Sequence, residues 1–301
     1  MAMTRTGEPT EATPAANPAE ADYTSVLVPL DGSDLAERAL APGRSLAARF
    51  GAELHIVVAG VGRDESWWYK RYVDGVRERM PGVTAHLSDD QDVPAAIVSA
   101  ARATDPCLVC MATHGRSRTA AIVGSTFTAV ATTSGAPLVA TGPRVAPAGE
   151  GTEPDDPIVV CLDGGTAAEV ALPLAAAWAR RLGLRVLLLT AADPVLLRSE
   201  LARERIRSGR RYGPDGDPQA YLHDIAGRRT FDGLAVDTQV LWGLAHPHVS
   251  IGEHLDRHPA TVVATTSRAR AGIARAALGS EAARLIRRSP APVLVQPVPR
   301  G

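Results

Sequence analysis

Residues 111–126, MATHGRSRTAAIVGST, carry the pattern that points most directly to chemistry. An apolar strand runs into this segment, Gly115 allows close approach of a backbone, and Gly124-Ser125-Thr126 opens a helix. A helix N-terminus presents unpaired N–H groups and the positive end of the helix dipole, which together suit a phosphate. The hydroxyls of Ser125 and Thr126 add donors. We therefore expect a phosphate-binding turn; the alternative is that the glycines serve turns and Ser125 caps the helix.

A second candidate lies at the end of the first apolar run, VLVPLDGS, at 26–33. Asp31 could accept a hydrogen bond from a ribose hydroxyl, as acidic residues do in related folds; alternatively it caps the following helix. The chain has neither GxxxxGK[ST] nor GxGxxG at these places. Phosphoryl transfer needs cations, Mg²⁺ and a positioned nucleophile. Only Arg116 and Arg118 are near the phosphate turn, so we expect binding without efficient catalysis.

The chain repeats these features. IVVCLDGG at 158–165 echoes the first run, and Gly279-Ser280 echoes Gly124-Ser125. After each Leu-Asp-Gly a polar residue stands three positions before a glutamate, Asp34 before Glu37 and Thr166 before Glu169, a spacing typical of a capping box at a helix start. The sequence therefore predicts two copies of one unit, each built of strands and helices.

Strands and helices are expected to alternate along both copies. Short apolar runs predict strands at 24–30, 53–59, 83–87, 107–112, 136–141, 157–162, 184–190, 235–241, 260–265 and 291–296. Periodic segments predict helices at 34–49, 65–80, 94–104, 125–133, 166–182, 247–257 and 279–288, with a longer helical excursion at 194–229. Strict alternation favours an α/β fold with two tandem, Rossmann-like, doubly wound domains, each a five-stranded parallel sheet with flanking helices.

Composition sets the boundaries. We predict a disordered tail at 1–22, a first domain at 23–146, a Pro/Gly/acidic linker at 147–156 and a second domain at 157–301. Lys plus Arg number 32 against 33 for Asp plus Glu, which disfavours a nucleic-acid binder. The chain has no apolar run of membrane-spanning length and no signal-like start, so we expect a cytoplasmic protein with no membrane contact. The CxxC of Cys107 and Cys110 lies inside an expected strand, which indicates buried thiols.

These motifs resemble the universal stress protein family. LVPLDGS, MATHGRS, GST and a closing APLVA strand carry the resemblance, and the whole chain resembles the tandem two-domain form. ATP-binding members carry G-x-x-G, nine residues, then G-S/T. On that motif Ala112 replaces the first glycine, Gly115 stands at the second, and Gly124-Ser125 follow after eight residues.

The resemblance also implies roles for residues outside the phosphate turn. Asp31 stands at the acid that contacts the ribose, and Val58, at the end of the second strand, lies near the adenine. The family dimerises through its last strands. The resemblance therefore implies that segments 136–141 and 291–296 pack the two domains on each other as a pseudo-dimer.

The second copy departs further from the motif. Thr266 and Ala269 stand where the family has glycines, and Glu281 follows at the helix start, where a carboxylate would repel a phosphate. The matching residues are Asp163, Gly279 and Ser280. We therefore expect one nucleotide per chain, in the first half.

The resemblance implies a stress-response regulator that binds an adenine nucleotide, ATP with Mg²⁺, with little or no catalysis. Two alternatives stay open. One is a nucleotide-free scaffold of the same fold that binds a protein partner, which the alanines and threonine at glycine positions favour. The other is a slow ATP hydrolase.

Overall fold

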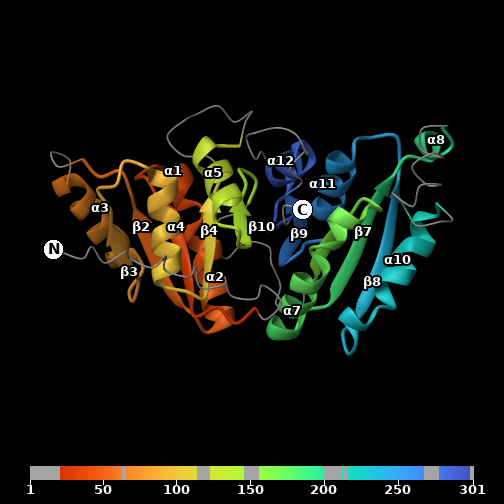
Figure 1. Cartoon of the computed structure of the whole chain (residues 1–301), viewed down its shortest axis with the longest axis horizontal. Helices are drawn as coiled ribbons and strands as arrows, with labels where there is room; N and C mark the ends of the chain where they lie inside the picture. The colour runs from red at the N-terminus through yellow and green to blue at the C-terminus, as the bar shows by residue number, and fades with distance from the viewer. Residues whose placement is uncertain are drawn as a thin grey trace, which may run out of the picture.

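The computed structural model of the chain describes residues 21–62, 66–113, 123–145, 156–199, 212, 216–267 and 278–298. Its strands form one ten-stranded sheet in the order β3-β2-β1-β4-β5-β10-β9-β6-β7-β8, which crosses the whole molecule in Figure 1. Within each half the strands are parallel. In the first half the strands are β1 Ser25–Leu30, β2 Glu53–Val58, β3 Thr84–Leu87, β4 Cys107–Ala112 and β5 Leu138–Thr141. In the second half they are β6 Ile158–Leu162, β7 Val186–Ala192, β8 Val236–Trp242, β9 Val262–Ser267 and β10 Val293–Pro297.

Helices cover both faces of the sheet. One core cluster lies under α1 Asp34–Glu37, α2 Leu40–Phe50, α3 Ser66–Arg79, α7 Leu172–Leu182 and α10 Pro218–Ala226. The other lies under α4 Val93–Ala103, α5 Ser125–Thr133, α11 Pro247–Arg257 and α12 Ser280–Arg288. Neighbouring residues of β1 alternate between the two clusters, as the period of a strand requires. Burial on both faces explains why β1 is almost wholly apolar.

The predicted doubly wound fold is confirmed. All ten predicted strands form, most of them with bounds shifted by a residue or two. The order β3-β2-β1-β4-β5 places a switch point between β1 and β4, and β6 and β9 repeat it in the second half. In such sheets ligands bind outside the carboxyl ends of the strands at this switch.

Two predicted helices are each broken in two. The segment 34–49 forms α1 and α2, and 166–182 forms α6 Thr166–Glu169 and α7. A proline lies in the first turn of both longer helices, Pro42 in α2 and Pro173 in α7. A proline ring clashes with the carbonyl four residues earlier and lacks an N–H, so a helix cannot continue through it.

The predicted capping boxes are wrong. Ser33, not Asp34, caps α1, and its hydroxyl accepts the Ala36 N–H at 3.2 Å. Gly165 caps α6 with no side chain at all. The two glutamates of the motif instead bind arginines, as described below. A close tertiary partner therefore outcompetes the local backbone donor.

The two halves meet through equivalent strands. β5 and β10 pair antiparallel, with Leu138 opposite Val295 and Val139 opposite Leu294. Beside this joint, Tyr23, Phe50 and Trp178 form an edge-to-face aromatic cluster between α2 and α7. The halves therefore share one continuous sheet and one part of the core.

The predicted tail and linker fall mostly outside the described residues, namely 1–20 and 146–155. The parts that are described pack against the fold. Ala21 is buried in the core, and Val145 is also buried. Arg144 donates to the Arg288 carbonyl at 2.8 Å and to Asp256 at 2.9 Å. Of the excursion at 194–229, the structure describes α8 Pro194–Leu197, α10 and a 3₁₀ turn at Arg229–Phe231.

Candidate nucleotide site

Asp31 follows β1 at the switch point and organises the turn there. Its Oδ1 accepts the Ser33 N–H at 3.0 Å and the Ser33 hydroxyl at 2.6 Å. Gly32 has φ +82°, a left-handed conformation that favours glycine. The carboxylate is thus held at the carboxyl end of β1, and one of its oxygens serves the turn.

The N-terminus of α5 lies at the carboxyl end of the neighbouring strand β4. Gly124 is the N-cap, and its N–H donates to the Thr113 carbonyl at 2.7 Å. A Cβ on Gly124 would lie 3.0 Å from that same oxygen, so the glycine permits a close contact between loop and helix. The N–H of Gly124 is therefore not a donor for a ligand. The next backbone N–H groups, from Ser125 onward, belong to the first turn of the helix, whose N–H groups have no intrahelical partner.

The start of α5 has neither a side-chain cap nor a first-turn acid, a combination that α2, α7 and α11 share and several other described helices lack. Side chains of Ser33, Asp92, Asp193 and Asp217 cap α1, α4, α8 and α10. α5 has no side-chain cap and no acidic residue in its first turn, while Ser125 is exposed and Thr126 half-buried. A helix start of this kind leaves its positive end available to an anion.

The other predicted residues of the first site take different places. Val58 is fully buried at the carboxyl end of β2, so it belongs to the core below the candidate site. Ala112 ends β4 and is half-buried beside Thr141 of β5. Gly115 lies outside the described residues. The structure thus brings Asp31, Ala112, Gly124 and Ser125 to adjoining strand and helix ends.

In the second half the equivalent helix start is occupied by an ion cluster. Gly279 caps α12 without a side chain, as Gly124 caps α5. Glu281, in the first turn, accepts from Arg284 at 2.7 Å and lies 3.2 Å from His248 of α11. Ser280 is exposed, Thr266 is buried in β9, and Ala269 lies outside the described residues. The carboxylate of Glu281 already uses the positive end of α12.

An aromatic side chain covers the Leu-Asp-Gly turn of the first half. Trp68, on α3, lies so close that a Cβ on Gly32 would clash with its Cη2 atom. Its ring lies parallel to that of Tyr72, with centroids 5.5 Å apart. Trp68 is still 38 % exposed, and its neighbour Tyr69 is buried. The aromatic run of α3 therefore both packs the helix and covers the rim of the candidate site.

Both halves contain a glutamate-tyrosine-arginine cluster that sequence reasoning missed. Glu37 accepts from Arg79 at 2.9 Å, and Glu169 accepts from Arg228 at 2.7 Å. Tyr221 donates to Glu169 at 3.1 Å. Burial and the nearby glutamate raise the pKa of Tyr221 well above its usual range, and Tyr72 shows the same pKa direction beside Glu37 for the same two reasons. The repeated spacing of seven residues from tyrosine to arginine was the available signal.

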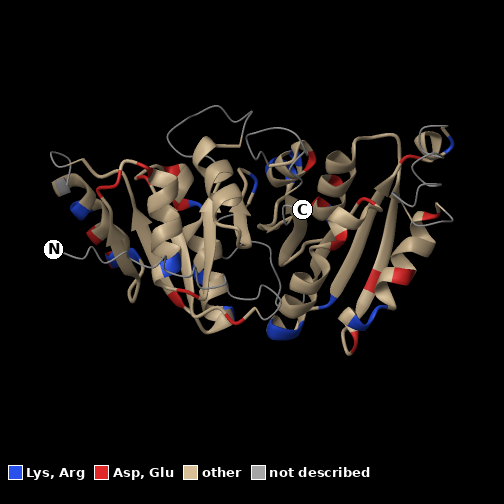
Figure 2. Ribbon diagram, in the orientation of Figure 1, with Lys and Arg blue, Asp and Glu red and all other residues tan. Residues whose placement is uncertain are grey.

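These clusters fix the helix that follows each turn. Glu37 lies on α1, directly after the Asp31 turn, and Arg79 lies at the end of α3. The pair therefore ties the first helical turn to the helix that carries Trp68. Figure 2 shows acidic and basic segments interspersed along both halves.

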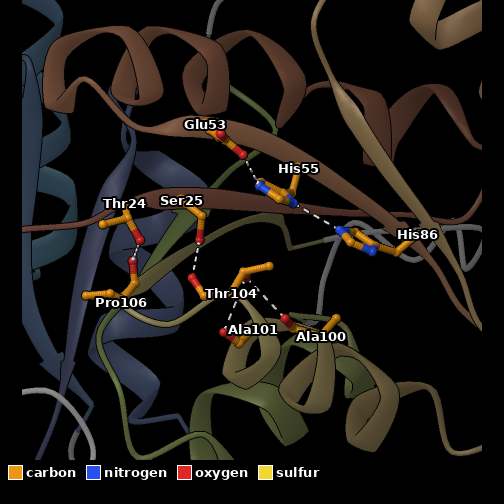
Figure 3. A network of polar contacts seen from close by, with 9 residues as sticks. All are labelled: Thr24, Ser25, Glu53, His55, His86, Ala100, Ala101, Thr104 and Pro106. Carbon is orange, nitrogen blue, oxygen red and sulfur yellow. Dashed lines mark hydrogen bonds and ion pairs between the residues drawn. The ribbon is translucent and has the colours of Figure 1, made fainter.

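A separate polar network lies near the amino ends of β1 and β2, opposite the candidate site (Figure 3). Nδ1 of His55 lies 2.9 Å from Nε2 of His86, and Glu53 lies 3.3 Å from the other nitrogen of His55. The ring centroids are 5.2 Å apart and the planes differ by 6°. That separation fits two coplanar rings joined edge to edge by one shared proton rather than stacked faces. Ser25 donates to the Thr104 carbonyl at 2.7 Å nearby.

Comparison with known proteins identifies the second half. A sequence profile described as the universal stress protein family matches residues 156–297. Residues 156–297 belong to the universal stress protein family. The strand order of this domain, β10-β9-β6-β7-β8, is repeated by the first half as β5-β4-β1-β2-β3.

Solved structures extend the likeness of fold to the whole chain. A universal stress protein from Archaeoglobus fulgidus aligns with a TM-score of 0.61 and 19% identity, covering 90% of this chain and 97% of that one. A functionally unknown protein from Pseudomonas aeruginosa PAO1 aligns with a TM-score of 0.58 and 18% identity, covering 93% and 94% of the two chains. No curated protein sequence matches significantly. At these identities the likeness establishes the fold of both halves. Among the described helices, none is long and apolar enough to cross a membrane.

Proposed function

We propose that this chain is a tandem universal stress protein that binds one adenine nucleotide, ATP, in its first half and acts as a stress-response regulator. The observation that carries the proposal is the start of α5, which is capped by a glycine and has no acid in its first turn. This helix start lies at the carboxyl end of β4, and β4 pairs with β1, the strand that ends just before Asp31. The triphosphate would lie against the N–H groups of α5, and the ribose would bind Asp31. Ala112 and Val58 would line the space between them.

The residues present fit a nucleotide better than a protein-held metal. The first turn of α5 offers N–H groups and the hydroxyls of Ser125 and Thr126, all suited to phosphate oxygens. Mg²⁺ binds substrate phosphates and keeps several waters. Mg²⁺ would therefore enter with ATP, and the protein would orient the phosphates.

A charge swap between the halves tests the site. Thr126→Glu gives α5 the carboxylate that Glu281 gives α12. Two unit charges about 6 Å apart repel by about 0.7 kcal/mol in water and about 3 kcal/mol near a protein surface. Since the triphosphate carries several charges, ATP affinity measured by calorimetry should fall at least about tenfold.

The matched control is Thr133→Glu, which adds the same charge at the other end of α5, where Thr133 is exposed. It should leave ATP affinity within about twofold. Equal losses in the two variants, or none in Thr126→Glu, would contradict a phosphate site at the helix start.

Binding without efficient hydrolysis is part of the proposal. No lysine lies in the phosphate turn, because Lys70 is the only lysine in the chain. Turnover should stay below about 1 s⁻¹, the lower end of typical enzymes. Faster release of phosphate would establish the hydrolase alternative, and freshly purified protein that neither carries nor binds nucleotide would establish the scaffold.

We also propose that one chain reproduces a family-type dimer. The β5–β10 register is that of a two-fold axis, because Leu138 pairs with Val295 while Ala140 pairs with Val293, and the repeated motifs APLVA and APVLV make these equivalent positions. Segments 23–146 and 152–301, expressed separately, should associate when mixed. Stable monomers that stay apart in sedimentation experiments would refute the pseudo-dimer.

A further inference from the structure

Tyr212 lies across the Leu-Asp-Gly turn of the second half. Its backbone N–H donates to the Gly164 carbonyl at 2.9 Å, and its hydroxyl lies 3.3 Å from the hydroxyl of Thr190. A Cβ on Gly164 would clash with the Cδ1 atom of the tyrosine ring. Only 2% of Tyr212 is exposed. The residue thus bridges the carboxyl ends of β6 and β7 as a buried part of the fold.

The positions that Tyr212 bridges have counterparts in the candidate site of the first half. Leu162 pairs with Thr190 as Leu30 pairs with Val58, so Thr190 is the counterpart of Val58. Gly164 corresponds to Gly32 in the repeated Leu-Asp-Gly. In the proposed site the nucleoside would lie between these same two positions. Tyr212 therefore stands where the second half would hold a nucleoside.

The backbone of Tyr212 shows that this placement is enforced by its surroundings. Its φ is +54°, in the left-handed region that non-glycine residues rarely adopt. Such strain persists where neighbouring contacts hold it. Tyr221 packs edge-on against the ring with centroids 5.8 Å apart, and Tyr221 is itself held by Glu169.

Among its described residues, the first half has no buried aromatic side chain that bridges the same two positions as Tyr212 does. Trp68 also lies over its glycine, but it comes from a helix, remains 38 % exposed and stacks on Tyr72 at the rim. Val58, unlike Thr190, has no side-chain hydroxyl to hold an aromatic partner. The two halves share one turn and differ in how firmly an aromatic residue closes it.

We propose that Tyr212 is a built-in occupant of the second nucleoside position, which keeps adenosine-type ligands out of that half. Its ring takes the place of the base, and its hydroxyl and N–H satisfy Thr190 and Gly164. Asp163, the counterpart of Asp31, is exposed, with one oxygen accepting the Gly165 N–H at 3.0 Å. The inference rests on the proposed function, because the first-half site defines where the nucleoside lies.

Adenosine is the probe that separates the effect of Tyr212 from that of Glu281, since adenosine lacks the phosphates that Glu281 would repel. Equilibrium dialysis of the full chain with adenosine should give one bound molecule in the wild type and two in Tyr212→Ala. The control Tyr212→Phe keeps the ring and should stay at one. Adenosine should also raise the melting temperature of Tyr212→Ala more than that of Tyr212→Phe, because a ligand that binds only the folded state stabilises it.

The outcomes separate this inference from the proposed function. One adenosine site in both the wild type and Tyr212→Ala would refute the exclusion of adenosine by Tyr212, and it would remain consistent with the first-half site. No site in the wild type but one in Tyr212→Ala would support exclusion by Tyr212 and refute the first-half site. Two sites in the wild type, or none in any variant, would refute exclusion by Tyr212. If circular dichroism shows Tyr212→Ala unfolded, Tyr212→Leu, which keeps apolar volume without the ring, is titrated in its place against the same criteria.

Discussion

Replacing Trp178 by alanine should lower the free energy of unfolding and uncouple the unfolding of the two halves. Trp178 is fully buried, its ring centroid lies 4.9 Å from that of Phe50, and its Nε1–H donates to the Tyr23 hydroxyl at 3.4 Å. Phe50 and Tyr23 belong to the first half, so one side chain of α7 fills a space that both halves line. Burial raises the pKa of the Tyr23 hydroxyl to about 12, although the hydrogen bond from Trp178 lowers that pKa in part.

The magnitude follows from this packing. Truncating a buried tryptophan to alanine costs about 3–5 kcal/mol, because the cavity cannot fully collapse. The edge-to-face contacts contribute about 0.5–1.5 kcal/mol each within that range. We expect a loss of about 4 kcal/mol, which corresponds to a fall of about 6 °C in the midpoint of the first transition, since the unfolding entropy is about 2.1 cal/mol/K per residue.

Differential scanning calorimetry is the assay, with Trp67→Ala as the matched control. Trp67 lies on α3 and is 66% exposed, so its removal should change stability by less than about 0.5 kcal/mol. The wild type should unfold in one transition, and Trp178→Ala in two, because the shared core no longer couples the halves. Equal Tm changes in the two variants, or a loss below about 1 kcal/mol in Trp178→Ala, would refute the reasoning.

Three further outcomes are expected. Gly142→Ala should lower the urea midpoint by an amount equivalent to about 1–3 kcal/mol, since its Cβ would clash with the Ile286 carbonyl across the joint; an unchanged midpoint would show that the joint yields easily. The pKa of His86 is lowered, first by burial and then by its histidine neighbour, so protonation favours the unfolded chain and stability falls as pH drops below about 6.5. His86→Leu should flatten that part of the stability curve measured by urea titration, and an unaltered slope would contradict the assignment. Burial raises the pKa of Cys110 and of Cys161 to about 12, so Ellman's reagent should modify neither thiol until the protein unfolds.

Local sequence was sufficient for the strands and for several helices. Strands covered on both faces are apolar along almost their whole length, and this pattern marks central strands such as β1 and β6, whereas the edge strands β3 and β8 carry polar residues and are partly exposed. The helix predicted at 125–133 has those bounds in the structure. Gly124 precedes it, and glycine has a low helix propensity, so the helix begins at Ser125. The repeat of Leu-Asp-Gly located both turns at strand ends.

Distant partners decided what the local pattern could not. Glu37 fits a capping box by spacing, yet its carboxylate binds Arg79, 42 residues away. Pro42 was visible in the sequence, but the break it produces was hidden by the strong apolar periodicity on both sides. Local propensity is a weak prior that a closer tertiary partner overrides.

The sequence by itself therefore determined the repeated α/β unit, the two Leu-Asp-Gly turns and the acid-free start of α5. These depend on apolar period and on the chemistry of adjacent residues. Only the tertiary structure decided the β5–β10 register and the place of Tyr212 over Gly164, 48 positions apart in the chain. Both depend on contacts between segments remote in sequence, whose geometry is set by the packed sheet and cannot be read from either segment alone.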